Sequence, residues 1–425
     1  MSSQAKVVAR VLGEELEKFE ADNICLKQTS IKRMGGQMGH RSEFTEWYDV
    51  PYIATTVDGL SITQYNEKTG LAVPHRVNVY ASVPFKLTNT DTLDSPENMR
   101  IISSAFQAID NRINRAVATA VLNQGSQFVP FAAAISNFSH IAAIDTLLGE
   151  QDIPASLDKT LIMNYGDGNS VANDLQGTGR TMSGIAKTAY EKALVSQVGG
   201  LDIFKTSFAP TKAAAAGGGA ITVNGANQDY DPVGHTLDSD GNPTNVDNRT
   251  QTLTVSATTN VAVGDKFTLA GVNALSLQNK NDTGNLRTFT VTEVVSGTEL
   301  RISPPIIVDS GTPNSTVTQA RDDYANCSAA PANGAAVTFL NTQTAQSNLF
   351  WVKDAVCINV APVVGSEDDL GGIIVMNETT DLGLNVVVAK QGSINDLSTN
   401  WRVTTFFGTT VTIPEMCGTL FGGQT

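Results

Sequence analysis

The clearest hydrophobic pattern in the chain runs from Ser95 to Gly125. Ser95 and Pro96 are typical of a helix start, and Gly125 can end a helix in a left-handed conformation. At 1.5 Å per residue such a helix is roughly 40 Å long, so we expect it to support sheets rather than join a bundle. Apolar residues at helical spacing form its predicted buried stripe: Met99, Ile102, Phe106, Ile109, Ile113, Val117 and Val121.

Two weaker patterns precede this helix. Residues 5–20 predict a short amphipathic helix with an acidic side, which either packs on its own domain or acts as an arm that docks on a neighbour. Strand-rich runs at 46–57 and 70–83 flank a polar turn at 65–70 and predict a long hairpin. An isolated hairpin is poorly stable in water, so we expect it to lie on a neighbouring subunit.

The region after the long helix mixes strand, loop and helix signals. Residues 158–165 predict a buried strand, 166–180 a glycine-rich loop, and 183–198 a second helix. The glycines of the loop lack both the P-loop pattern and G-x-G-x-x-G spacing. We therefore predict a turn there rather than a phosphate site.

A composition change at residues 213–220, AAAAGGGA, marks a domain boundary. Short strand patterns with turn signals follow it, which is typical of a small β-barrel or sandwich. Ser296-Gly297 predicts a tight hairpin between the last two of these strands. Residues 221–340 therefore predict a separable insert, with strands at 251–256, 263–272, 287–295 and 298–303.

Strand patterns like those that precede the insert resume after it. Residues 349–363 and 384–393 are apolar and strand-like, and 401–413 alternates like a closing strand pair. The ends of the insert must lie close together if the chain returns to its first domain.

Composition narrows the class of protein. With 41% hydrophobic and 16% charged residues, the 425-residue chain suits strand-rich structure in two or three domains. The net charge of −14 argues against binding DNA through phosphate neutralisation, though not against enclosing DNA. Four cysteines without CxxC spacing predict free buried thiols in a reducing cytosol. We expect a soluble product with no membrane span and no secretory signal.

Candidate chemistry is sparse. His40, His75, His140 and His235 are not spaced for a metal, so we expect surface or hydrogen-bonded loop positions for them. The segment 238–242 resembles the start of a calcium loop, but Pro243 and Arg249 occupy its glycine and glutamate positions. An acidic hairpin tip that meets a basic partner is the preferred interpretation. We predict no catalytic residues, no cofactor and no metal.

The order of these elements resembles a known family: a short helix, a polar-tipped hairpin, a long helix, central strands, an inserted β-barrel and further strands. The chain resembles the major capsid (coat) proteins of short-tailed, temperate-type (podovirus-type) tailed bacteriophages. The resemblance is strongest in the second half of the chain, in LDSDGNPTNVDNR (237–249), FTVTEVVSGTELRISP (289–304), NLFWVKDAVCI (348–358) and GLNVVVAKQGSINDLSTNWRV (383–403).

This resemblance implies an α+β fold of the Hong Kong 97 type with an inserted all-β barrel domain. A long spine helix (95–125), an extended β-hairpin loop (45–80), and peripheral and axial domains are the features of that fold. The implied domains are an N-terminal arm (1–34), a first core part (35–220, with axial part 128–185), the insert (221–340), and a second core part (341–425, with axial part 345–402 and peripheral end 403–425).

The resemblance also implies contact sites. The inserted domain would reach an adjacent capsomer through its acidic loop, the N-terminal helix would contact a scaffolding protein, and the extended loop would contact a neighbouring subunit. The residues implied are, in that order, Asp238, Asp240 and Asn242; Glu14 and Glu15; and Glu67 and Lys68. We expect no crosslink through Lys68, since the sequence gives it no partner.

The implied function is assembly into an icosahedral procapsid and then a mature virion shell in the host bacterial cytoplasm. The implied partners are copies of the chain in pentamers and hexamers, a separate scaffolding protein and a portal protein. The shell would enclose double-stranded DNA without reading its sequence. Two alternatives remain open at this point: the shell of an encapsulin-like compartment, and a β-rich extracellular adhesin or binding module.

Overall fold

A computed structural model describes much of the chain in two compact units. Unit 1 comprises Met1–Glu46, His75–Val117 and Cys357–Thr410. Unit 2 comprises Trp47–Pro74, Ala118–Val356 and Val411–Thr425. The residues described are 23–34, 44–49, 71–87, 95–177, 197–215, 220–232, 236–237, 243–244, 247–309, 316–361, 374–380, 383–393 and 398–424.

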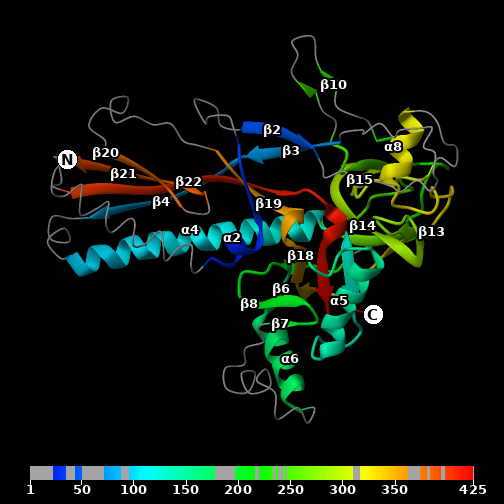
Figure 1. Ribbon diagram of the computed structural model, residues 1–425, viewed down its shortest axis with the longest axis horizontal. Coiled ribbons are helices and arrows are strands. Elements are labelled where there is room, and N and C mark those ends of the chain that lie inside the picture. The colour runs from blue at the N-terminus through cyan, green and yellow to red at the C-terminus, as the bar shows by residue number, and fades with distance from the viewer. Residues whose placement is uncertain are drawn as a thin grey trace, which may run out of the picture. The chain divides into compact units, whose positions relative to one another are not determined.

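The main sheet of unit 1 joins distant parts of the sequence (Figure 1). Its strand order is β1-β19-β22-β21-β20, and β4 also pairs with β22. The bounds are Ser30–Arg33 for β1, Val79–Leu87 for β4, Val356–Val360 for β19, Ile374–Thr379 for β20, Asn385–Ser393 for β21 and Ser398–Val411 for β22. Here β1 runs parallel to β19, whereas β20, β21, β22 and β4 are antiparallel.

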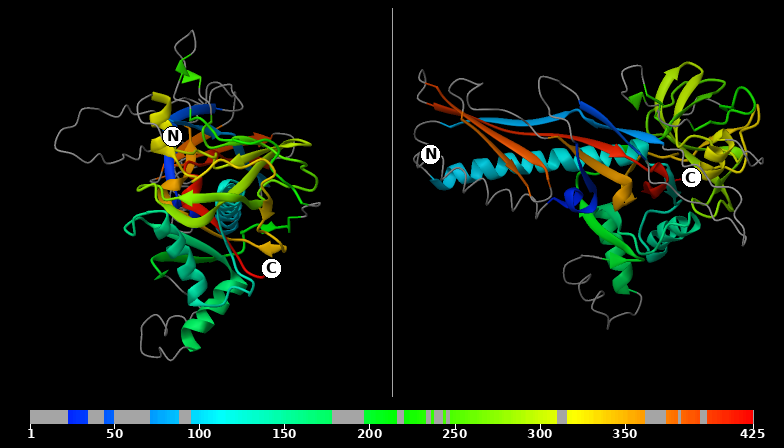
Figure 2. Two further views of the ribbon diagram at one scale, coloured as in Figure 1. Left: turned by 90° about the vertical axis from the view of Figure 1, so that its right-hand side faces the viewer. Right: turned by 45° about the horizontal axis from the view of Figure 1, so that its top comes forward.

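Helix α4 (Ser95–Gln124) is the predicted long helix and confirms that prediction. Its unit 1 part lies along the strands of the main sheet in Figure 1 and in the right-hand view of Figure 2. Phe106, Ile109, Ile113 and Val117 are at most 3% exposed, as the stripe predicted. Asn114, next to this stripe, accepts the backbone N–H of Cys25, the second residue of the short helix α2 (Ile24–Gln28).

Gly125 ends α4 differently from the prediction. It is not among the described glycines with positive φ, so it does not form a left-handed cap. Its N–H closes the last turn on Val121 O at 2.9 Å. A Cβ at Gly125 would lie 2.7 Å from Val121 O and 3.0 Å from Cys417 O, so close backbone approach explains the glycine instead.

A mixed six-stranded sheet in unit 2, called here the supporting sheet, has the order β5-β23-β18-β6-β8-β7. Its strands are Gln127–Pro130 (β5), Lys159–Asn164 (β6), Gln197–Val198 (β7), Leu201–Thr206 (β8), Asn348–Val352 (β18) and Cys417–Phe421 (β23). All of β6, β18 and β23 is buried, which confirms the strand predicted at 158–165. Helix α5 (Phe138–Glu150) buries Ile141, Ile144 and Leu148 in the same core.

The loop predicted at 166–180 is wrong over its described part, because α6 (Tyr165–Gly177) is a helix. Asn164 accepts the N–H of Asp167 at 2.9 Å and donates to the Asp167 carboxylate at 2.7 Å. This pairing caps the helix start, and buried Val171 and Ala172 anchor the helix on the core. Cap and packing therefore outweigh the low helix propensity of Gly166 and Gly168.

A five-stranded antiparallel sheet, called here the β12–β16 sheet, has the order β12-β15-β14-β13-β16. Its strands are Gln251–Thr254 (β12), Lys266–Leu275 (β13), Asp282–Ser296 (β14), Glu299–Ser303 (β15) and Val337–Phe339 (β16). All four strand patterns predicted between 251 and 303 are confirmed, as is the tight hairpin at Ser296-Gly297. Its core includes Leu253, Phe267, Phe289 and Ile302, each fully buried.

Two predictions after the insert were wrong in detail. The single run 349–363 is two strands, β18 and β19, separated by the 3-10 turn Lys353–Ala355, and these strands belong to different sheets. The predicted closing pair at 401–413 is one long strand, β22. Of the helix predicted at 183–198, only 197–198 is described, and those residues form β7. The helix predicted at 5–20 lies outside the described residues.

The division into insert, axial and peripheral parts stays a prediction. Strands from residues 345–402 divide among three sheets: β17 (Ala345–Gln346) pairs with β9 (Thr211–Lys212), β18 joins β6 and β23, and β19 to β22 join β1 and β4. Among the described helices, none is long and apolar enough to cross a membrane.

Candidate functional site: polar joints around the β12–β16 sheet

The predicted contact residues Asp238, Asp240, Asn242, Glu14, Glu15, Glu67 and Lys68 lie outside the described residues. Paired strands flank two of the three sets in the sequence. β10 (Thr236–Leu237) pairs antiparallel with β11 (Pro243–Thr244), on either side of 238–242. β2 (Phe44–Asp49) and β3 (Ala72–Val77) form a two-stranded sheet and precede and follow Glu67 and Lys68.

What the structure does place is a set of polar joints that fasten the β12–β16 sheet within unit 2. The first joint centres on Lys266, a fully buried side chain. Its ammonium donates to Leu122 O at 2.9 Å, to Thr290 Oγ1 at 2.8 Å, and to Gly125 O. Leu122 O and Gly125 O are carbonyls at the end of α4, where no further helical turn supplies a donor. Lys266 therefore caps the helix from another part of the chain.

A second layer of contacts holds Lys266 in place. Asp265 forms an ion pair with Lys212, with 2.8 Å between the carboxylate oxygen and the ammonium nitrogen. The side chain of Asn341 accepts the backbone N–H of Lys266 and donates to the Asp265 carboxylate. Burial lowers the pKa of Lys266 to about 7. The nearby Lys212 contributes to this lowering, while Cys417 and Asp265 act in the opposite direction.

Sequence reasoning missed this joint for a physical reason. In β13 and β14, Lys266 pairs with Thr290 while Phe267 pairs with Phe289. Alternation places the two pairs on opposite faces of the sheet, so Lys266 reads as solvent-facing. The face of the sheet that carries Lys266 is instead covered by the end of α4. The hydrophobic pattern of a single strand does not indicate that another element covers it.

The second joint is a buried ion pair between Arg287 of β14 and Glu415. Arg287 Nη2 lies 3.1 Å from Glu415 Oε1, in a contact that lacks hydrogen-bond geometry, and its Nη1 donates to Gln151 Oε1 at 3.2 Å. The two side chains are 2% and 12% exposed. Asn326 also donates to Glu415, at 3.4 Å, so one carboxylate gathers partners from two segments.

The third joint is at the end of α5. Leu277 donates its N–H to Gln151 O at 3.2 Å, and Asn279 donates to the Asp152 carboxylate from both its backbone and its side chain. Asn285 donates to Glu150 at 3.0 Å. The turn between β13 and β14, together with Asn285 on β14, is thus hydrogen-bonded to three successive residues at the end of α5, 150–152.

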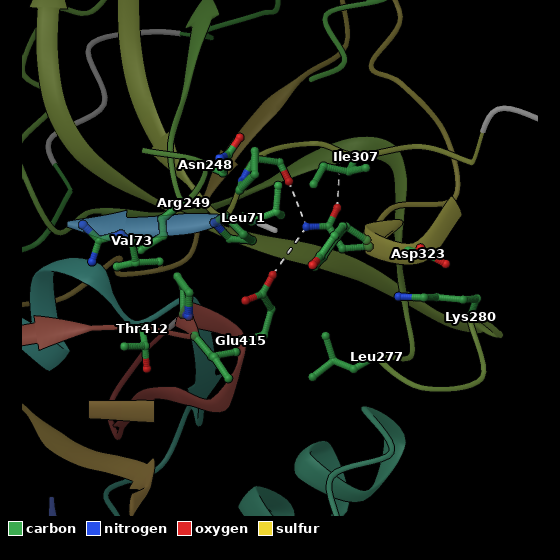
Figure 3. A pocket seen from close by; sticks show the side chains of 16 residues that line it. Leu71, Val73, Asn248, Arg249, Leu277, Lys280, Ile307, Asp323, Thr412 and Glu415 are labelled. Carbon is green, nitrogen blue, oxygen red and sulfur yellow. Dashed lines mark hydrogen bonds between the residues drawn. The ribbon is translucent and has the colours of Figure 1, made fainter. Parts of the chain in front are cut away.

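A cavity of about 90 Å³ opens beside the second joint. Figure 3 shows Glu415, Lys280 and Asp323 among its lining side chains, opposite the apolar Leu71 and Val73. Lys280 donates to Ala325 O at 3.1 Å. Burial lowers the pKa of Lys280 to about 8, and the charges of Glu415 and Asp323 partly oppose that shift. The acidic and basic side chains in this lining are equal in number.

The four cysteines are free and buried, as predicted. Burial raises the pKa values of Cys25, Cys327 and Cys417, so all three favour the unreactive thiol form. Within the described ranges, no group of three His, Cys, Asp or Glu residues is placed to hold a metal ion.

Two histidines are hydrogen-bonded as predicted, but in elements rather than in loops. His75 on β3 is 2% exposed and lies 2.7 Å from the Asn359 side-chain oxygen. His140 on α5 accepts the Ser136 N–H at 3.2 Å and packs against Phe131. His40 and His235 lie outside the described residues.

A family model described as P22 coat protein, gene protein 5, matches residues 2–423. The chain belongs to this family. It is accordingly a major capsid protein, and many copies of it build an icosahedral virion shell. The mixed α+β architecture described above is the fold of such a capsid protein.

Several solved structures are similar to this coat protein. The CUS-3 coat protein I-domain is 40% identical, covering 29% of this chain and 96% of that chain, with a TM-score of 0.22. The capsid of Cyanophage P-SCSP1u is 10% identical, covering 93% and 86% of the two chains, with a TM-score of 0.42. A virus-like particle from Pyrococcus furiosus is 10% identical, covering 97% and 96%, with a TM-score of 0.39.

In this shell subunit, the joints hold the β12–β16 sheet on the elements beside it. They combine Lys266 with helix carbonyls, Arg287 with Glu415, and the β13–β14 turn and β14 with the end of α5. Directional contacts fix the angle of a sheet on its support better than apolar contact does, because hydrogen bonds weaken steeply away from their preferred geometry.

Proposed function

We propose that this coat protein assembles with a separate scaffolding protein into a procapsid of pentamers and hexamers. The procapsid, which includes a portal protein, matures into the shell that encloses double-stranded DNA. The observation that carries the proposal is the coat-protein family match over residues 2–423. Assembly takes place in the host bacterial cytoplasm, and the chain contributes contact surface rather than enzymatic chemistry.

Residues 45–80 are proposed as the extended loop that overlaps a neighbouring subunit, with Glu67 and Lys68 in the contact. The pairing of β2 with β3 supports this proposal, because a segment between paired strands starts and ends at one place on the body. A loop of this kind can reach across a subunit boundary without disturbing the fold beneath it.

Asp238, Asp240 and Asn242 of the predicted acidic loop are proposed to contact an adjacent capsomer. Support comes from their position between β10 and β11, whose pairing brings the ends of the segment together. Two carboxylates within three residues favour a basic partner surface. Such a contact would weaken as ionic strength rises, because salt screens the attraction between the charges.

The domain arrangement is proposed to follow the prediction, with residues 221–340 forming an inserted barrel. The five-stranded sheet at 251–339 and its own apolar core support this proposal. So does the bridge between Thr222 and Ala336, which brings the two ends of the segment together.

Negative-stain electron microscopy of the protein, expressed with and without its scaffolding partner, tests the proposed assembly. We expect uniform closed shells with the partner, and unassembled or irregular material without it. Uniform shells of the same size in both conditions would refute the need for a scaffolding protein.

The proposed scaffolding contact at Glu14 and Glu15 has its own test. Changing both residues to Gln removes the charge that a basic scaffold segment would meet, so we expect fewer closed shells at equal monomer stability. The matched control changes Glu17 and Glu20, acidic residues of the same predicted helix. An equal loss in the two double variants would point to general charge rather than to a specific contact.

A further inference from the structure

The end of α4 and the β12–β16 sheet meet through a single charged side chain. Lys266 directs its three ammonium protons at three acceptors, two of which belong to the helix end and one to the neighbouring strand. Thr290 Oγ1 also donates to Gly125 O at 2.7 Å, which ties the same carbonyl to β14. The acceptors are all neutral, so the hydrogen-bonding partners of the ammonium carry no opposite charge.

An ammonium without a carboxylate at hydrogen-bonding distance is an expensive group to bury. Asp265, the neighbouring carboxylate, is ion-paired with Lys212 and hydrogen-bonded to Asn341. The groups that face Lys266 from the surrounding elements are the Cys417 thiol, the Lys212 ammonium and the Asp265 carboxylate. The last turn of α4, Val121–Gln124, presents no titratable side chain, and on β14 the facing group is the hydroxyl of Thr290.

We propose that Lys266 is a releasable, proton-dependent latch between the C-terminal end of α4 and the β12–β16 sheet. The latch is fastened when the lysine is buried, and protonation favours its release because water solvates the ammonium better than neutral acceptors do. Lys266 is thus a positioning residue for the shell subunit: it sets how firmly the sheet holds the helix end, and it makes that hold depend on pH.

The direction of the pH dependence follows from proton uptake. Lys266 has a pKa of about 7 when buried, against an ordinary value of 10.5. Between these two values, opening the latch or unfolding the chain takes up one proton. The equilibrium constant for opening therefore falls about tenfold for each unit that the pH rises in this window. Below pH 7 the dependence on Lys266 disappears, because both states carry the proton.

The test compares Lys266→Met with the natural protein in urea unfolding of the unassembled subunit, from pH 6 to pH 10. We expect the ratio of the two unfolding constants to be constant below pH 7. Between pH 7.5 and 9 we expect the constant of the natural protein to fall about 30-fold relative to that of the variant. Lys159→Met is the matched control, since this lysine is also buried in unit 2 but pairs with Asp145, away from the latch. The control should retain the relative fall.

Hydrogen exchange of the segment 118–126 reports the latch locally. After correction for intrinsic exchange, protection in the natural protein should rise with pH between 7.5 and 9, and protection in Lys266→Met should not. If Lys266→Met fails to fold, Thr290→Val serves instead. It removes one acceptor of the ammonium and should move the onset of the pH dependence lower by about one unit or more.

Parallel pH profiles for Lys266→Met and the natural protein would overturn the proposal. That result would mean that Lys266 keeps one charge state in both forms and acts as a fixed structural contact. The assignment of the chain to the coat-protein family would be unaffected, because the measurement is made on single subunits.

Discussion

At the scale of single residues, the β12–β16 sheet carries two positive charges into the interior and compensates them differently. Lys266 meets neutral oxygens at the end of α4, whereas Arg287 meets the carboxylate of Glu415. A buried ion pair contributes little when formed but is costly to break on one side, because the remaining charge has no partner. The two joints should therefore respond to different perturbations: pH for the first and loss of a charge for the second.

Glu415→Gln should destabilise unit 2 by about 3 kcal/mol or more, because it leaves Arg287 charged, buried and without its carboxylate. The urea midpoint of the unassembled subunit is the measurement. Glu293→Gln is the matched control, since Glu293 pairs with Arg301 on the same sheet with both side chains about half exposed. It should cost less than about 1 kcal/mol. Equal effects of the two changes would contradict the importance of burial here.

Gly408 provides a steric test in unit 1. A Cβ at this position in β22 would lie 1.7 Å from Arg76 O, which neither backbone can avoid without moving. Gly408→Ala should lower the free energy of unfolding by about 3 kcal/mol or more. Gly392→Ala in the adjacent strand β21 has nothing within 4 Å and should change it by less than about 0.5 kcal/mol. A variant of Gly408 with an unchanged urea midpoint would refute the close approach.

At the scale of elements, agreement between sequence and structure depended on how local each signal is. Helix α4 and the strands β12, β13, β14 and β15 carry their period within their own sequence, and each was predicted, whereas the three-residue strand β16 was not. Helix α6 was missed because its cap, Asn164, belongs to the end of a buried strand and its glycines suggested a turn. The hydrophobic periodicity of a segment indicates which of its residues are buried, but not which other element packs against them.

The same limit applied to the candidate site. Lys266 and Arg287 look like surface residues in alternating strands, so no pattern separated them from Arg301, which is exposed. Their partners lie far away in the sequence, at Leu122 for Lys266 and at Glu415 for Arg287. Only three-dimensional placement brings such groups together.

The cap of α6 can be tested on its own. Asn164→Ala removes the acceptor for the Asp167 N–H and one partner of Asn348, so we expect a loss of about 1–2 kcal/mol. The far-ultraviolet circular dichroism signal and the urea midpoint measure it. Ser170→Ala, an exposed position within α6, should shift the midpoint by less than about 0.5 kcal/mol. A larger shift from Ser170→Ala than from Asn164→Ala would contradict the capping role.

At the scale of the whole molecule, the β12–β16 sheet has its own apolar core and is fastened to its support by polar joints. A sheet with these properties can fold from contacts that are close in sequence. Local contacts form early in folding, because they close short loops. The sheet is therefore expected to help the chain reach its fold as well as to shape the subunit.

Phe289→Ala separates these two roles. Phe289 is fully buried and its ring centroid lies 5.7 Å from that of Phe267, so its truncation should cost about 3–5 kcal/mol. We expect the soluble yield to fall while the shells that do form keep their geometry in electron micrographs. Leu286→Ala on the same strand, 44% exposed, should leave both unchanged. Normal yield with misshapen shells would show that the sheet acts mainly in assembly.

The parallel pairing of β1 with β19 has a consequence for synthesis on the ribosome. Ser30 lies opposite Cys357, and the strands that complete the sheet come later still. At about 5–20 residues per second, β1 waits on the order of 15–65 s for its partner. During that wait the β12–β16 sheet has already emerged in full. Translation therefore imposes an order of events. The part of unit 1 that is made last completes the sheet, whereas β1 of the same sheet is among the first segments to leave the ribosome.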